Sequence, residues 1–118
     1  MEKMATLAEA EELLQEIHEQ IRKYGILFIN GRDKNRQTLA NLGIMAAQQR
    51  EIIDRIQADD YCGGPDPDER YPWKSVSVFG ATFRGVELYV KFSVGVDKTP
   101  VVCLSFHEAE YPMRYAFK

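Results

Sequence analysis

The chain has 118 residues, of which 45% are hydrophobic and 28% charged, and its formal net charge is −3. This length predicts one domain over residues 1–118, with a hydrophobic core that needs no disulfide or metal. No basic start precedes an apolar stretch, and no apolar run approaches the roughly 18 to 20 residues that span a bilayer. The sequence therefore argues against a secreted or membrane protein, and we expect a cytoplasmic one.

Charge is distributed unevenly along the chain. Residues 1–69 hold 8 Lys or Arg against 14 Asp or Glu, whereas residues 70–118 hold 7 against 4. The basic C-terminal half predicts a nucleic-acid partner there, although such charges also simply solvate a surface. Cys62 and Cys103 are isolated from each other, form no C-x-x-C pair and have no His at metal-ligand spacing. We expect reduced thiols, no metal site and no cofactor.

The N-terminal half is predicted to be mainly helical over residues 6–57. Thr6 and Glu9 form a capping box before an apolar stripe at helical spacing, and Gly25 and Gly43 are helix-ending residues. The pattern predicts a helix over 6–24, a short strand over 26–29, and helices over 33–42 and 46–57. Residues 59–72 are rich in Gly, Pro and Asp and are predicted as a surface loop.

Residues 73–107 alternate between apolar and polar side chains, which predicts an antiparallel meander followed by an irregular tail over 108–118. The strands are expected over 73–83, with a bulge near Gly80, over 86–94 and over 101–107. Val102, Leu104 and Phe106 are expected in the core. The fold class is therefore α+β, with the helices packed on one face of a mainly antiparallel sheet and the other face open.

Parity constrains the register of the last two strands, because both apolar sets must face the core. Paired numbers that add to about 196 suit the connecting loop. They pair Val94 with Val102, Phe92 with Leu104, Val90 with Phe106, and Tyr89 with His107. A slip of two residues sets Tyr89 against Ser105, with His107 as a diagonal neighbour. In either register Tyr89, Lys91 and His107 share the open face.

A phenol, an amine and an imidazole on an open face suit RNA cleavage without a metal. In that reaction a ribose 2′-OH attacks the adjacent phosphate, so groups that transfer protons and cations that stabilise charge are needed. We predict His107 as general acid or base and Tyr89 as a group that orients the ribose or shares proton transfer. The predicted phosphate contacts are Lys91, Lys74 and Arg84, and the predicted base-stacking residues are Trp73, Tyr71 and Tyr61.

Four segments resemble the MqsR (motility quorum-sensing regulator) family of toxin–antitoxin proteins: GRDKNRQTL at 31–39, Asp60-Tyr61 with Gly64-Pro65, LYVKF at 88–92, and LSFHEAEYP at 104–112. The resemblance implies a RelE-like fold, sequence-selective mRNA cleavage, and an antitoxin partner with a zinc-binding domain and a DNA-binding domain.

Individual positions within these segments carry the resemblance unequally. Tyr89 falls at the family's functional tyrosine, and Lys91 is the lysine of the same strand. His107 stands where better-known members have a lysine, and Lys74 where they have a glutamine. A further family lysine has no counterpart at Gly63.

The sequence leaves three functions open. The leading hypothesis is a toxin-type endoribonuclease, an mRNA interferase that binds and cleaves single-stranded mRNA and is inhibited by a cognate antitoxin. The alternative is a non-catalytic module that binds a protein through the open sheet face or its edge. A weaker third reading is a small-ligand domain with an aromatic pocket.

Overall fold

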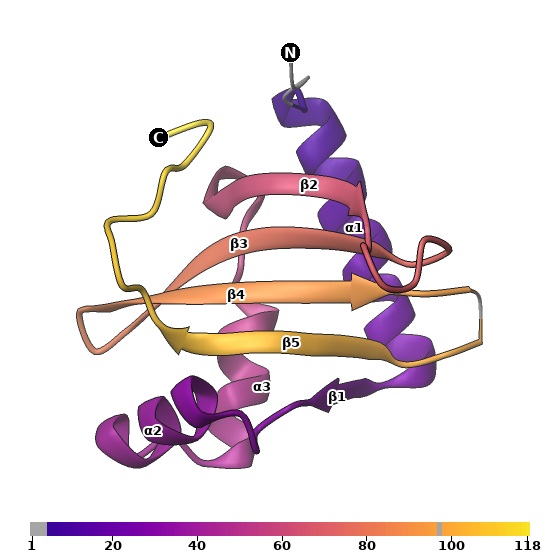
Figure 1. The fold of residues 1–118 in the computed structure, drawn as a ribbon. Helices are drawn as coiled ribbons and strands as arrows, with labels where there is room; N and C mark the ends of the chain where they lie inside the picture. Colours follow the sequence, from indigo (N-terminus) through magenta and orange to yellow (C-terminus); the bar gives the residue numbers. More distant parts are fainter. Residues whose placement is uncertain (1–4, 97) are drawn as a thin grey trace.

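A computed structural model of the protein describes residues 5–96 and 98–118. Three helices and one sheet make up the regular structure of these residues (Figure 1). In chain order the elements are α1 (Leu7–Tyr24), β1 (Ile26–Phe28), α2 (Asp33–Leu42), α3 (Ala46–Asp54), the 3₁₀ turn η1 (Ala58–Asp60), β2 (Tyr61–Pro67), β3 (Ser75–Phe83), β4 (Val86–Val94) and β5 (Val101–Glu108).

The described strands form a mixed sheet in the order β1-β5-β4-β3-β2, in which β1 runs parallel to β5 and the other neighbours are antiparallel. In Figure 1, α1 and α3 lie behind the sheet, and α2 lies beside the β1 and β5 edge. The front face of β2 to β5 carries no helix. The predicted α+β class, with helices on one face of a mainly antiparallel sheet, is confirmed.

The first helix forms as predicted. Thr6 Oγ1 accepts a hydrogen bond from the Glu9 N–H at 3.2 Å, and the Glu9 carboxylate accepts one from the Thr6 N–H at 3.0 Å. The apolar stripe on the opposite face is buried: Ala10, Leu14, Ile17 and Ile21. Gly25 ends the helix at a φ of 89°, a conformation that favours glycine. Within the described residues, no helix is long and apolar enough to cross a membrane.

The second and third helices differ from prediction only at their ends. Arg32 is the N-terminal cap of α2, and Asp33 is its first residue. α3 ends at Asp54, earlier than residue 57, yet Ile56 beyond it is 3% exposed. Ile56 is thus buried, like Ile52 and Ile53, although the backbone leaves the helix before it.

The predicted surface loop over 59–72 is wrong in its first half, because Tyr61–Pro67 forms the edge strand β2. Its pairing with β3 has register shifts on both sides of Gly63. Gly64 has a φ of 93°, and a Cβ there would lie 2.5 Å from the Val76 carbonyl oxygen. Prolines lack the N–H that a central strand needs but are tolerated at an edge. Glycine and proline therefore serve an irregular edge strand here.

The predicted bulge near Gly80 is also wrong. β3 and β4 pair without interruption from Ser75 with Val94 to Phe83 with Val86. Phe79 lies in the core, whereas Val76 and Val78 line hollows on the open face. Without a bulge, the alternation of the strand leaves these two valines on the open face instead of in the core.

The irregularity lies instead between β4 and β5. Tyr89 pairs with His107 and Val90 with Phe106, as predicted, but Phe92 pairs with Cys103 and Ser93 with Val102. The extra residue in β5 shifts its faces, so the predicted pairs of Phe92 with Leu104 and of Val94 with Val102 are wrong. Val101 and Cys103 are fully buried in place of Val102 and Leu104, which line the open face.

A buried side chain of α2 satisfies the backbone groups at this bulge. Asn35, only 2% exposed, donates hydrogen bonds to the carbonyl oxygens of Leu104 at 3.1 Å and Ile29 at 2.8 Å. Its own amide oxygen accepts from the Phe106 N–H at 3.0 Å. Because unpaired backbone groups are costly to bury, Asn35 stabilises the bulge and fixes α2 against β5.

Candidate active site on the open sheet face

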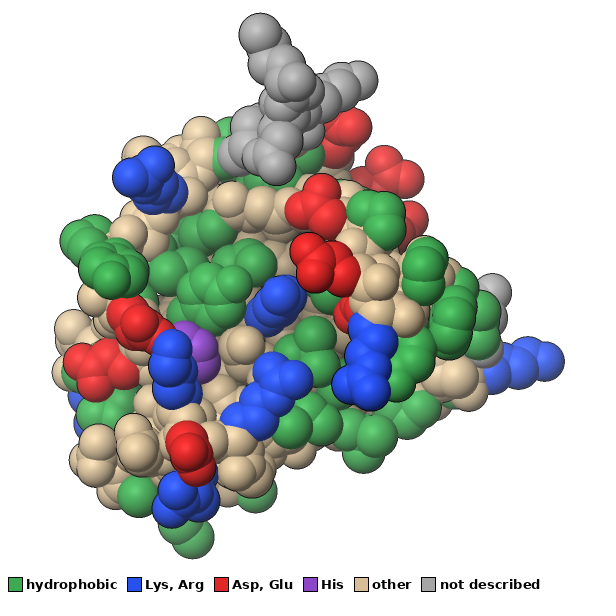
Figure 2. All heavy atoms as spheres, in the orientation of Figure 1, with side chains coloured by type: hydrophobic (Ala, Val, Ile, Leu, Met, Phe, Trp, Pro, Cys, Tyr) green, Lys and Arg blue, Asp and Glu red, His purple; other side chains and the backbone are tan. Residues whose placement is uncertain are grey.

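Two adjoining hollows lie on the open face. The first, of about 690 Å³, lies between the sheet and residues 109–114, and we call it the tail hollow. The second, of about 520 Å³, lies between the sheet and the loop around residues 67–71, and we call it the loop hollow. Lys91, Val76 and Asp66 line both. Figure 2, which views this face, shows Lys and Arg side chains gathered around its middle beside apolar ones.

His107 and Tyr89 form a stacked pair in the tail hollow. Their ring centroids are 5.2 Å apart and the rings are inclined by 13°. His107 Nδ1 lies 3.0 Å from the Glu108 carbonyl oxygen. A carbonyl only accepts, so Nδ1 carries the hydrogen and Nε2 is the nitrogen left for a ligand. The predicted contact between Tyr89 and His107 is confirmed as a geometry, and its catalytic role stays a prediction.

Tyr89 and Lys91 differ in how their polar ends are held. Burial, with a smaller contribution from the Cys62 thiol, raises the pKa of Tyr89, so its phenol is a neutral hydrogen-bond donor. Lys91 lies diagonal to His107, because it pairs with Ser105 while Tyr89 pairs with His107. Among residues 5–96 and 98–118, the Lys91 ammonium has no hydrogen-bond or ion-pair partner. It is therefore available to an anion.

The start of α2 adds two basic residues that the sequence analysis missed. The Arg32 guanidinium donates to the Leu104 carbonyl oxygen at 3.3 Å, and Lys34 forms an ion pair with Glu110. Arg32 lines the loop hollow and Lys34 the tail hollow. Counting charge by chain halves placed both in the acidic half. Their position depends on α2 docking against β5, and the only sequence signal was the GRDKNRQTL segment.

An aromatic cluster borders the loop hollow. The Tyr71 and Trp73 rings are 5.3 Å apart, and Lys74 Nζ lies 5.2 Å from the Tyr71 ring centroid. Trp73 is 64% exposed, so its face is open to a ligand. Asp68 accepts hydrogen bonds from the N–H groups of Tyr71 and Arg70, which hold the pKa of its carboxyl below the usual value. The structure thus brings the predicted residues Tyr71, Trp73 and Lys74 together.

Two predicted RNA contacts do not reach the site. Tyr61 is only 1% exposed; its ring stacks on Phe117 and meets Phe79 edge to face, so its predicted role in base stacking is wrong. Arg84 occupies the tight turn between β3 and β4 at a φ of 51°, and its guanidinium lies 4.7 Å from the Phe83 ring centroid. It lines neither hollow.

The two hollows are locally basic although the chain is acidic overall. In the described part of the chain, their lining holds six Lys or Arg residues, namely Arg32, Lys34, Arg70, Lys74, Lys91 and Arg114, against four acidic residues, Asp66, Asp68, Glu69 and Glu110. A single-stranded polyanion fits such a lining. The structure shows no group of three or more His, Cys, Asp or Glu that could hold a metal ion within residues 5–96 and 98–118.

Both cysteines are free, protonated thiols. Burial raises the pKa of Cys62 to about 11 and that of Cys103 to about 12. Cys62 lines the tail hollow, and its high pKa makes it a poor nucleophile. The imidazole, phenol and amine remain the reactive groups of the site.

Comparison with protein-family models, with curated proteins and with solved structures yields no match to this chain. The resemblance of its four segments to MqsR toxins therefore stays a prediction, and the geometry of the open face carries the functional argument.

Proposed function

We propose that the protein is a cytoplasmic endoribonuclease of the toxin type, which cleaves single-stranded mRNA. The observation that carries the proposal is the stacked pair of Tyr89 and His107 beside the Lys91 ammonium, which makes no hydrogen bond or ion pair in the described structure, on a basic face whose adjoining loop hollow is bordered by exposed aromatic rings. These are the groups that RNA cleavage by 2′-OH attack requires.

The proposed reaction uses only side chains of the open face. The 2′-oxygen loses its proton and bonds to phosphorus, the bond from phosphorus to the 5′-oxygen breaks, and that oxygen gains a proton. The products are a 2′,3′-cyclic phosphate and a 5′-hydroxyl. His107 Nε2 accepts the proton of the 2′-hydroxyl and the imidazolium then donates a proton to the departing 5′-oxygen, because Nδ1 is held by the Glu108 carbonyl. The Lys91 ammonium stabilises the charge that develops on the phosphate.

Tyr89 supports this chemistry as a neutral phenol. Its raised pKa keeps the proton on the oxygen, so it donates a hydrogen bond to the ribose or the phosphate instead of repelling it. Its ring also fixes the plane of the His107 imidazole. We therefore place Tyr89 both as a substrate contact and as the support for His107.

The proposed regulator is a cognate antitoxin protein with a zinc-binding domain and a DNA-binding domain. This part of the proposal rests on the MqsR-like segments alone. A neighbouring reading frame that encodes a small protein with two C-x-x-C pairs or a helix-turn-helix would support it. The corresponding measurement is whether that product inhibits RNA cleavage by the purified protein, and whether cleavage returns when the product is removed.

The test of the nuclease is cleavage of single-stranded RNA by purified protein in the presence of a metal chelator. We expect fragments that end in a 2′,3′-cyclic phosphate and begin with a 5′-hydroxyl. His107→Ala should slow cleavage by about 100-fold or more, the usual contribution of a general acid or base. His18→Ala is the matched control, because His18 lies on α1, on the covered side of the sheet. Intact RNA after incubation with the wild type would contradict the proposal.

The non-catalytic binding module is the other outcome of this test. If the wild type binds a protein partner and leaves RNA intact, and substitutions at Tyr89 weaken that complex, the binding module replaces the nuclease. Its surface would be the same open face.

A further inference from the structure

The C-terminal tail forms one wall of the tail hollow. From the end of β5 it runs in an extended path past the ends of β4, β3 and β2 (Figure 1). Residues 109–114 line the hollow opposite the sheet. Within this wall Tyr111 is 80% exposed, the largest exposed fraction among the bulky apolar and aromatic side chains that the structure describes.

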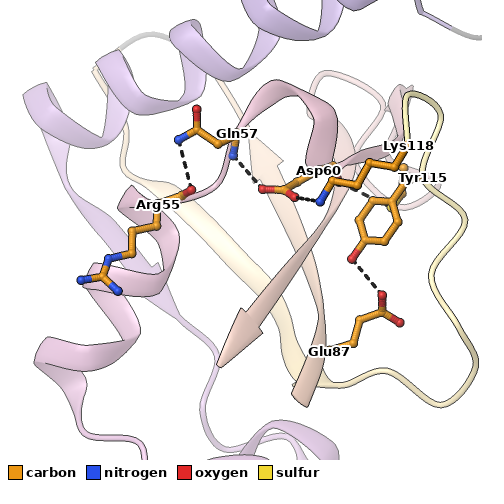
Figure 3. A network of polar contacts seen from close by, with 7 residues as sticks. Arg55, Gln57, Asp60, Glu87, Tyr115 and Lys118 are labelled. Carbon is orange, nitrogen blue, oxygen red and sulfur yellow. Dashed lines mark hydrogen bonds and ion pairs between the residues drawn. The ribbon is translucent and has the colours of Figure 1, made fainter. Parts of the chain in front are cut away.

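A single glutamate of β4 fixes the tail at three points. The Glu87 carbonyl oxygen accepts from the Ala109 N–H at 2.9 Å, and its carboxylate accepts from the Met113 N–H at 2.9 Å. The second carboxylate oxygen accepts from the Tyr115 hydroxyl at 3.0 Å (Figure 3). Burial, reinforced by the Glu87 carboxylate, raises the pKa of Tyr115, so this donor keeps its proton. The backbone on both sides of Tyr111 is therefore anchored.

The tail is also anchored beyond Tyr115. Gly80 of β3 lies under the Tyr115 ring, which a Cβ at that position would strike. The Ala116 N–H donates to the Tyr61 carbonyl oxygen at 3.1 Å. The Lys118 ammonium lies 2.6 Å from Asp60 and 4.6 Å from the Tyr115 ring centroid (Figure 3). These contacts hold the tail against the sheet without using the Tyr111 side chain.

Tyr111 itself contributes little to folding. Its ring has no aromatic or cationic partner, and its hydroxyl has no hydrogen bond, among residues 5–96 and 98–118. An exposed ring gains almost none of the free energy that apolar burial provides. The hydrogen-bonded tail thus presents an exposed aromatic ring to the proposed catalytic hollow, whose lining also includes the exposed Arg114.

The loop hollow repeats this arrangement on the other side of Lys91, with Trp73 and Tyr71 beside Lys74. Both hollows fall in the range of about 300 to 1,000 Å³ that ligand sites occupy. We infer that each hollow holds one nucleotide of a single strand, on either side of the phosphate at Lys91, with Tyr111 as the stacking platform in the tail hollow. This inference rests on the proposed RNA substrate and adds a base-binding residue to it.

The test uses a mixed-sequence oligonucleotide with 2′-O-methyl riboses, which binds but has no free 2′-OH to attack. Fluorescence anisotropy should show that Tyr111→Ala weakens binding by at least about fivefold, and Tyr111→Phe by less than about twofold, because the phenyl ring still stacks. Tyr24→Ala is the matched control, because Tyr24 is 38% exposed at the end of α1. Unchanged affinity of Tyr111→Ala overturns the inference, as does a wild type that does not bind the probe.

A second variant tests whether the tail must be held in place. Tyr115→Phe removes only the hydrogen bond from the Tyr115 hydroxyl to Glu87, so it should weaken binding less than Tyr111→Ala does. The double variant of Tyr111→Ala and Tyr115→Phe should bind no more tightly than Tyr111→Ala alone. If Tyr115→Phe and Tyr111→Ala both bind the probe as tightly as the wild type does, the tail has no role in binding.

Cleavage of unmodified RNA, measured in parallel, separates the subsite from the nuclease. If Tyr111→Ala loses affinity but the wild type cuts no RNA, the nuclease proposal fails and the subsite stands. If the wild type cuts RNA and Tyr111→Ala binds and cuts equally well, the subsite fails and the nuclease stands.

Discussion

The side chains on the two faces of the sheet differ in their noncovalent partners. Phe106 and His107 are neighbours in β5 and point to opposite faces. Phe106 is 1% exposed and packs edge to face on Phe28, with ring centroids 6.1 Å apart. His107 stacks on Tyr89 and keeps one ring nitrogen without a partner in the described structure. The covered face holds the molecule together, and the open face leaves polar groups available for a ligand. Substitutions should therefore separate stability from activity.

The largest loss of stability is expected on the covered face. Phe106→Ala removes a fully buried ring and should lower the free energy of unfolding by about 3 to 5 kcal/mol. Urea unfolding followed by circular dichroism measures this change. If His107→Ala, one residue away, proved equally destabilising, the distinction between the two faces would be wrong.

Removal of the side chain that supports the bulge should have the next largest effect. Asn35→Ala removes the side-chain partner of the Phe106 N–H and of the Ile29 carbonyl oxygen and leaves the Leu104 carbonyl oxygen with Arg32 alone, so it should cost about 1 to 3 kcal/mol. Asn41→Ala, at an exposed position of the same helix, is the control and should change stability little. Equal unfolding midpoints for the two variants in urea would contradict the role of Asn35.

Alkaline pH should weaken the covered face through a buried thiol. Burial raises the pKa of Cys103 from the ordinary value of 9.0 to about 12. Above pH 9 the unfolded chain releases this proton and the folded chain keeps it, so the contribution to stability is complete below pH 9 and is lost toward pH 12. Between about pH 8 and pH 10 the wild type should lose about 1 kcal/mol more than Cys103→Ala. If the wild type and Cys103→Ala lose the same unfolding free energy over this pH range in urea titrations, burial does not raise the pKa of this thiol.

The smallest change in stability is expected at the open face. Lys91→Ala should alter the free energy of unfolding by no more than about 0.5 kcal/mol, because its ammonium makes no hydrogen bond or ion pair in the described structure. It should also reduce the slope of log affinity against log salt for single-stranded RNA by about 0.7. Lys23→Ala on α1 is the control and should leave this slope unchanged. A salt dependence that is unaltered in Lys91→Ala would place the phosphate elsewhere.

Local patterns predicted the elements whose neighbours in space are also neighbours in sequence. The capping box, the apolar stripe of the first helix, and the hairpin pairing of Tyr89 with His107 depend on short-range spacing and parity, and all three are observed. β2 was missed because glycine and proline favour turns as well as irregular edge strands. Its assignment as a strand depends on pairing with β3, which composition does not reveal.

The parts of the site that depend on contacts between distant segments could not be predicted from the sequence either. The bulge in β5 depends on Asn35, which is far away in the chain and reaches β5 only after α2 has docked. The same docking brings Lys34 to the tail hollow. Tyr61 was predicted as a base contact because an aromatic ring can stack on an unpaired base, and it lies in the segment that was predicted to be a surface loop. Its burial follows from strand β2 and from the tail, whose Phe117 stacks on it.

The most direct measurement is the rate of RNA cleavage by His107→Ala relative to the wild type and to Phe106→Leu, with all three proteins folded. We predict that His107→Ala loses cleavage by about 100-fold or more while its free energy of unfolding stays near that of the wild type. Phe106→Leu should show the reverse, with lower stability and retained cleavage. Wild-type activity that persists in folded His107→Ala, or a wild type that cuts no RNA, would contradict the assignment of the open face as a nuclease site.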